Sequence, residues 1–206
     1  MMQRYFIRGI LVLLFFFFIS GNIFAQAWTF IKERDGIKIY TRNEQNSSLK
    51  SFMGVMDLKT QMKKVTSMIG NVKNTSWWDE NVKEVKVLAY EENKYMQYYL
   101  VYHAPWPLTD RDLCVEARIT IDSVTGCHTI YTVPLPGVVP DRTDKVRIRN
   151  YWQRWTIQPM PNGVIHLVLE GYADPGGSIP SWIYNMVITE TPLNILRGIQ
   201  RTVAAH

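Results

Sequence analysis

The sequence predicts an α+β domain in which an antiparallel sheet packs against a long C-terminal helix. Many short segments with strand character follow one another and are joined by tight turns, whereas parallel sheets need helical crossovers between strands. Helical segments occur only early in the chain and at its end. Strands grouped in this way, with helices kept separate, are typical of α+β folds rather than of βαβ units.

The predicted strands cover most of the chain. They span residues 37–41, 49–57, 82–90, 95–103, 111–121, 127–133, 146–157 and 164–173. Between the second and third strands, residues 58–69 have helical periodicity and residues 71–79 form a short helix or a turn. That turn ends in Trp77 and Trp78, and we expect at least one of these tryptophans to belong to the core.

The residues just before the C-terminal helix can only form a loop. Pro175 fixes its own φ, and the two glycines after it permit positive φ. Ser178 is a suitable N-cap and Pro180 suits a first helical turn. An apolar face then repeats at helical spacing, at Ile179, Trp182, Ile183, Met186 and Val187.

Pro192 interrupts this helix, because an interior proline removes a backbone hydrogen bond. The apolar stripe also changes direction there. We therefore expect two half-helices, the first closing the interior as a movable lid and the second packed on the outside of the domain. The alternative is a rigid bent helix with the entrance elsewhere.

Residues 1–27 have the features of a secretory signal peptide. Arg4 and Arg8 form a basic start, an apolar run extends from Ile10 to Ile19, and small residues precede a cleavage site near Ala25 or Ala27. The apolar run is about half of the ~20 residues that a membrane-spanning helix needs. We expect an exported protein, periplasmic or secreted, whose residues 28–206 form one domain.

Composition and charge exclude several classes of function. The formal charge of +5 includes Arg4 and Arg8, and the remaining small, scattered basic excess does not indicate nucleic-acid binding. It is compatible with transient contact with an anionic membrane surface. No spacing of histidines and cysteines indicates a metal site. Cys114 and Cys127 are out of register across their hairpin, so we expect two free thiols.

Three motifs, in order along the chain, resemble START (StAR-related lipid-transfer) domains, particularly the phosphatidylcholine-transfer type. They are Asp35-Gly36-Ile37-Lys38-Ile39-Tyr40, Pro105-Trp106-Pro107-Leu108-Thr109-Asp110-Arg111-Asp112, and Asp174-Pro175-Gly176-Gly177 continuing to Trp182. The resemblance implies a helix-grip fold, in which a curved antiparallel sheet wraps around the C-terminal helix and one lipid lies between them. One position departs from the phospholipid-carrying relatives, which have an arginine where this chain has Thr75. That change weakens the case for phosphate recognition and favours a sterol-like or other neutral ligand.

Alternation along the strands, together with the resemblance, gives a set of candidate ligand-binding residues. Arg111 begins an otherwise apolar strand face, where it either reaches solvent or binds a polar head group or an interior acid. For the strands at 95–103 and 146–157, the resemblance assigns one face of each to the interior. The candidates are Tyr98, Leu100, Tyr102, Arg111, Leu113, Val115, Tyr151, Gln153, Trp155, Trp182 and Met186.

The predicted function is therefore binding, and possibly transfer, of one lipid or sterol-like molecule by a monomer that needs no cofactor. No nucleophile elbow, phosphate-binding glycine loop or cysteine–histidine arrangement indicates catalysis. Two rivals remain. The first is a cyclase or hydrolase that uses the same interior, since the helix-grip superfamily includes polyketide cyclases and aromatases. The second is a purely structural or protein-interaction domain, whose interior would be filled with side chains.

Overall fold

The computed structural model describes residues 27–204, apart from residues 74, 76 and 79. The predicted signal peptide therefore lies outside the described residues, except for its last position. None of the helices in the described part of the chain is long and apolar enough to cross a membrane.

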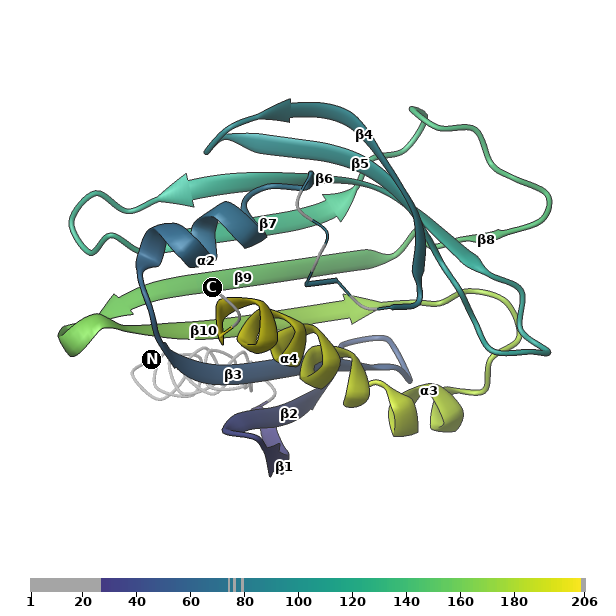
Figure 1. Ribbon diagram of the computed structural model, residues 1–206. Coiled ribbons are helices and arrows are strands. Elements are labelled where there is room, and N and C mark those ends of the chain that lie inside the picture. Colours follow the sequence, from purple (N-terminus) through teal and green to yellow (C-terminus); the bar gives the residue numbers. More distant parts are fainter. Residues whose placement is uncertain (1–26, 74, 76, 79, 205–206) are drawn as a thin grey trace, which may run out of the picture.

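The described residues form one large sheet with helices on one side (Figure 1). Its strands are β1 (Thr29–Arg34), β2 (Ile37–Asn43), β3 (Lys50–Lys59), β4 (Val82–Glu91), β5 (Tyr95–Tyr102), β6 (Arg111–Ile121), β7 (His128–Pro134), β8 (Val146–Arg147), β9 (Tyr151–Met160) and β10 (Val164–Ala173). The helices are α2 (Met62–Ile69), α3 (Ser181–Val187), α4 (Glu190–Ala204) and the short 3₁₀ helix η1 (Pro161–Gly163).

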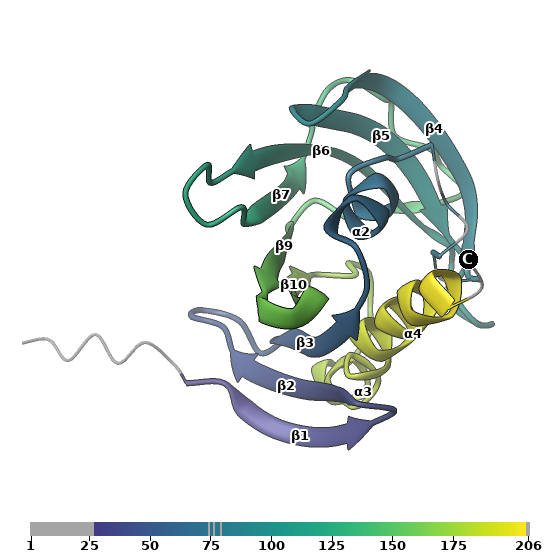
Figure 2. The same ribbon diagram turned by 60° about the vertical axis from the view of Figure 1, so that its left-hand side comes forward.

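The sheet is antiparallel, as predicted, in the order β1-β2-β3-β10-β9-β7-β6-β5-β4, and only the short β8 pairs in parallel, with β6. Because β3 lies in one half of the sheet and β4 at the far edge, the chain must cross the sheet between them, and α2 makes part of that crossing. Figure 2 shows the strands arranged as an arc, with α2 and α4 on its concave side. The predicted helix-grip architecture is confirmed.

α4 fills the concave side, contrary to the expectation that the second half-helix packs on the outside. Leu193, Leu196 and Ile199 are fully buried in the main core. The helix can approach the sheet closely because β3 has Gly54 beneath it: a Cβ there would lie 2.6 Å from Leu196 Cδ1. The predicted change of direction of the apolar stripe is real, but the stripe after the break turns toward the core.

A second close approach lies at Gly198 of α4, where a small substitution is expected to have a large effect on stability. A Cβ on Gly198 would lie 2.1 Å from the carbonyl oxygen of Trp77, so backbone faces backbone and neither side can yield easily. Gly198→Ala is expected to lower the free energy of unfolding by about 1–3 kcal/mol through overpacking, despite the better helix propensity of alanine. Urea denaturation measures this loss, with Asn194→Ala on the exposed side of α4 as the control. A stabilised Gly198→Ala variant would contradict the packing.

Four local expectations differ from the structure. The early helix begins at Met62 rather than at residue 58, because Leu58 and Lys59 extend β3 along β10. The segment 146–157 divides into β8, which pairs with β6, and β9. β1 was not predicted, since its side chains are mostly exposed and carry no alternation. α3 begins at Ser181, with Pro180 rather than Ser178 as its N-cap.

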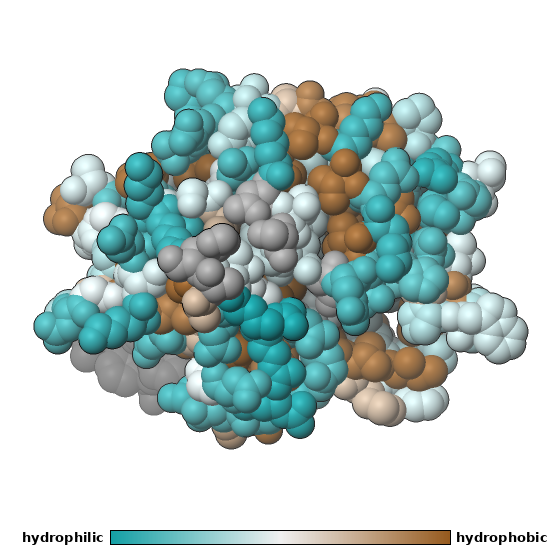
Figure 3. Space-filling model, viewed as in Figure 1, coloured by the Kyte–Doolittle hydropathy of each residue, from teal (hydrophilic) through white to brown (hydrophobic). Residues whose placement is uncertain are grey.

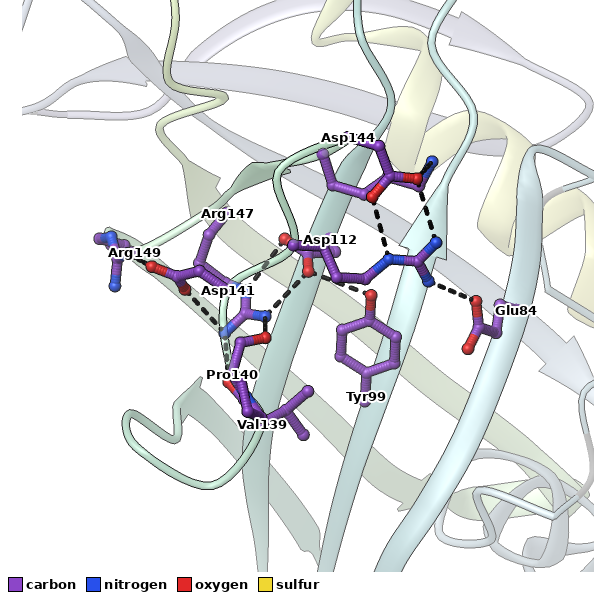
Figure 4. A network of polar contacts seen from close by, with 11 residues as sticks. Glu84, Tyr99, Asp112, Val139, Pro140, Asp141, Asp144, Arg147 and Arg149 are labelled. Atoms are coloured by element: carbon purple, nitrogen blue, oxygen red, sulfur yellow. Dashed lines mark hydrogen bonds and ion pairs between the residues drawn. The ribbon is translucent and has the colours of Figure 1, made fainter.

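On the convex side, the segment between β7 and β9 is attached to the outer face of β6. Fully buried Asp112 accepts hydrogen bonds from Arg147, with Nε to Oδ1 at 2.9 Å and Nη2 to Oδ2 at 2.8 Å (Figure 4). Arg147 also donates to the carbonyl oxygens of Val139 and Pro140, and Tyr99 donates to Asp112. The buried carboxylate of Asp112 thus holds Arg147 against β6, whereas Arg149 is exposed and forms an ion pair with Asp141.

Candidate functional site: the interior between the sheet and the helices

The interior-facing sides of β5, β6 and β9 were predicted correctly. Tyr98, Leu113, Val115 and Trp155 belong to the main core, and Leu100 and Tyr151 pack against it. The alternate residues of β5 lie on the other side of the sheet, where Tyr99 and Val101 form a small separate cluster with Cys114. Tyr102 is half-buried at the end of β5, where its register partner is Arg111.

A small space, which we call the inner space, lies within this interior, between the middle of the sheet and the crossing segment. Its volume is about 30 Å³. The residues around it are Ile69, Val72, Trp77, Trp78, Met96, Tyr98, Ile130, Thr132, Gln153 and Trp155. Ordinary ligand pockets measure about 300–1,000 Å³, so a lipid-sized molecule requires the interior to widen. A wider hollow of about 480 Å³ lies at the surface beside the turn from β3 to α2, lined by polar residues such as Lys59 and Asn162.

The lining is aromatic and uncharged. Trp77, in the core as expected, meets Trp155 edge-on with ring centroids 5.8 Å apart, and Trp78 packs on Tyr98 at 5.7 Å. Burial raises the pKa of Tyr98 to about 12, and burial together with the nearby Tyr98 raises the pKa of Tyr151 well above its usual value. Both phenols are therefore neutral hydrogen-bonding groups at any physiological pH.

Arg111 connects β6 to the loop before α3. It is only 6% exposed and shares the interior face of Leu113 and Val115. Its guanidinium donates to the carbonyl oxygen of Thr109 and, through Nε at 3.3 Å, to that of Pro175. Burial lowers the pKa of Arg111. No carboxylate within the described residues forms an ion pair with it, so its charge is met by backbone carbonyls rather than by the interior acid considered above.

The structure places Trp182 and Met186 differently from the expectation. The apolar face predicted to close the interior points to solvent: Trp182 is 65% exposed and Met186 64%, with Val187 and Ile183 beside them. Figure 3 shows the resulting hydrophobic patch over α3. α3 instead inserts Tyr184, which is buried, and Ile188 follows it into the core. Helical periodicity identified an apolar stripe but not the side that it faces.

Sequence reasoning missed the residue that fastens α3. The side chain of Asn185 accepts a hydrogen bond from the backbone N–H of Lys50 and donates one to the carbonyl oxygen of Ser48, both at 2.9 Å. The side-chain amide thus pairs with one backbone N–H and one backbone carbonyl at the turn between β2 and β3, as the backbone of a neighbouring strand would. An asparagine in a helix gives no signal of such a contact, because its partners lie 135 and 137 residues earlier in the chain.

Trp78 and Thr132 were also absent from the predicted set, although both line the inner space. Thr132 follows the alternation of β7 and could have been found from it; Trp78 lies in an irregular segment without periodicity. Cys114 is buried, Cys127 is half-buried, and both are free thiols, as predicted. Within the described residues, no three His, Cys, Asp or Glu side chains are grouped as metal ligands.

Comparison with known proteins agrees with this architecture. The START domain family model matches residues 25–206, so the chain belongs to the START domain family. An uncharacterised protein of Pseudomonas aeruginosa is 30% identical over 184 residues, which cover 89% of this chain and 90% of that protein. The phosphatidylcholine transfer protein of Mus musculus is 26% identical over 178 residues, covering 84% of this chain and 81% of that protein.

Solved structures show the same fold. A STAR-related lipid transfer protein fragment from Xanthomonas axonopodis superposes with a TM-score of 0.78 at 30% identity, covering 86% of this chain and 98% of that one. Human StAR-related lipid transfer protein 5 gives a TM-score of 0.76 at 15% identity, covering 99% and 97% of the two chains. At that identity the second likeness concerns the fold alone.

Proposed function

We propose that this protein is exported and binds one lipid or sterol-sized apolar molecule between the sheet and its helices, without chemistry. The observation that carries the proposal is the continuous apolar and aromatic lining of β5, β6, β7 and β9 beneath α2 and the crossing segment. Burying an alkyl chain there gains about 0.8 kcal/mol for each CH₂ group. The names of the relatives, which include lipid transfer proteins, support the same class of ligand.

The lining also favours binding over catalysis. The ten described residues around the inner space include no Asp, Glu, His, Lys or Cys. Their one ionisable side chain is that of Tyr98; burial raises its pKa to about 12, so it is a poor general base or acid near neutral pH. A cyclase or hydrolase would need a pair of groups with more suitable pKa values.

Native mass spectrometry of the protein purified from cells tests the binding. We expect one lipid to co-purify, or one phospholipid, sterol or fatty acid to be taken up when offered afterwards. A protein that neither retains nor takes up any of them would refute the proposed function.

The hydrophobic patch on α3 supports a proposal about membranes. Trp182, Met186 and Val187 expose an apolar surface, and Trp106 in the loop between β5 and β6 is 91% exposed. Tryptophan and aliphatic side chains on one face of a helix suit the interfacial region of a bilayer. We propose that α3 touches the membrane surface when ligand is exchanged and that the monomer acts alone.

Arg111 provides a test of head-group recognition. If its guanidinium contacts the polar part of the ligand, Arg111→Ala should weaken ligand binding by about 1–3 kcal/mol, the range for a hydrogen bond to a charged group. Stability should fall less than binding does, since only two backbone carbonyls lose their donor. Isothermal titration and thermal denaturation of the same variant give both quantities. Equal affinity in variant and wild type would mean that Arg111 serves only to hold the loop at Pro175.

A further inference from the structure

The indole N–H of Trp78 is buried and has no hydrogen-bond partner among the described residues. Its neighbour Trp77 is different, because Nε1 of Trp77 donates to the carbonyl oxygen of Met68 at 3.3 Å. A buried donor without an acceptor is costly, and native proteins rarely keep one without a function. The donor on Trp78 therefore calls for an acceptor that the described residues do not supply.

Trp78 also lines the inner space of about 30 Å³. The ring of Trp78 is held between Trp77, edge-on at 5.9 Å, and Tyr98. Thr132 and Gln153 line the same space, and neither side chain forms a hydrogen bond within the described part of the chain. Three residues with unpaired polar side-chain groups, an indole N–H, a hydroxyl and an amide, thus line one small space in an otherwise apolar interior.

We infer that Trp78, Thr132 and Gln153 form a site for one uncharged acceptor oxygen, a carbonyl, ester or hydroxyl oxygen of a neutral lipid. This inference rests on the proposed function and narrows the class of its ligand. The indole can only donate, so the ligand must accept. A phosphate would bring a charge into a space that is lined by none of the described Lys, Arg or His residues, and an unpaired buried charge is strongly unfavourable.

The test compares three probes delivered from detergent micelles: cholestanone, which has one carbonyl oxygen, cholestane, which has none, and dioleoyl phosphatidylcholine, which has a charged head group. Trp78→Phe removes the N–H and keeps an aromatic ring. Trp152→Phe is the matched control, because Trp152 alternates with Tyr151 and Gln153 and so lies on the opposite face of β9. Binding is measured for each pair by native mass spectrometry and by titration.

Wild type and Trp152→Phe should bind cholestanone about two- to tenfold more tightly than cholestane, the ratio that one net hydrogen bond gives. In Trp78→Phe the ratio should fall to about one. Two results would overturn the inference: a ratio near one in wild type, or a preference for cholestanone that Trp78→Phe retains. The second result would mean that the indole binds only a trapped water, for which the space is large enough. Tighter binding of phosphatidylcholine than of cholestanone would overturn the neutral class while leaving the proposed function intact. Failure of all three probes, and of the lipids named above, would refute both.

Discussion

Asp112→Ala is expected to lower the free energy of unfolding by about 3–5 kcal/mol, because it leaves a buried guanidinium without its carboxylate. Asp112 is fully buried, and the side chain of its partner Arg147 is only 9% exposed. Two parallel N–H···O hydrogen bonds join them, and the Tyr99 hydroxyl donates a third at 3.0 Å. Neither water nor another described acid can replace the carboxylate fully, although Asp141 lies 3.5 Å from Arg147 on the exposed side.

The position of this ion pair explains why its loss should also affect the interior. Arg111 and Asp112 are consecutive, so the first points inward to the loop at Pro175 and the second outward to Arg147. β8 runs beside the same two residues, and a Cβ on Gly176 would lie 3.0 Å from Val146. The start of β6 is thus held from both sides of the sheet, next to the loop from which α3 begins.

Urea denaturation followed by tryptophan fluorescence measures the loss. Arg149→Ala is the control, because its ion pair with Asp141 is exposed and such pairs contribute about 0–1 kcal/mol. A loss in Asp112→Ala as small as that in the control would show that the convex-side network contributes little. Asp112→Leu combined with Arg147→Met should restore much of the stability, since replacing both ions of a buried pair is often neutral.

The sequence predicted the sheet and the apolar face of β6 because both follow from local patterns, whereas the inner faces of β5 and β9 were assigned from the resemblance to START domains. In β6, Leu113 and Val115 share one face, and Asp112 and Glu116 share the other. Turns such as that at Gly126 are encoded by neighbouring residues. The extra strand β1 could not be predicted in the same way. It is an edge strand whose side chains are mostly exposed, so apolar and polar residues do not alternate along it. Backbone pairing with β2 is the main interaction that stabilises it.

The polar contacts that hold β6 and α3 escaped prediction for a different reason: they join segments that are far apart in the chain. Arg147 and Asp112 are 35 residues apart, and Asn185 and Ser48 are 137 apart. A charged or amide side chain shows no preference for burial until its partner is known. The apolar stripe of Trp182 and Met186 was recognised, but the same periodicity fits a helix that faces a core and one that faces a membrane.

Asn185 is the contact through which the lid hypothesis can be examined. Asn185→Ala removes two hydrogen bonds that hold α3 on the turn between β2 and β3, each contributing about 0.5–1.5 kcal/mol. If α3 must swing outward for ligand to pass, the open population and the exchange rate should rise together, by about five- to 100-fold. Exchange of a fluorescent fatty acid between vesicles, followed by stopped-flow, measures the rate.

Locking α3 should have the opposite and larger effect. The variant combines Asn185→Cys and Ser48→Cys with Cys127→Ser, which removes a competing thiol. The two new thiols lie where the side-chain amide of Asn185 now donates to the backbone carbonyl of Ser48. The reduced protein lacks the amide and should exchange ligand faster than wild type, whereas a disulfide formed by mild oxidation should reduce exchange to a small fraction of that rate, because opening then requires breaking a covalent bond. The two states of one protein serve as each other's control, and mass spectrometry confirms the bond. Equal exchange in the oxidised and reduced forms would rule out α3 as the lid and would favour a rigid bent helix with its entrance at another place on the domain.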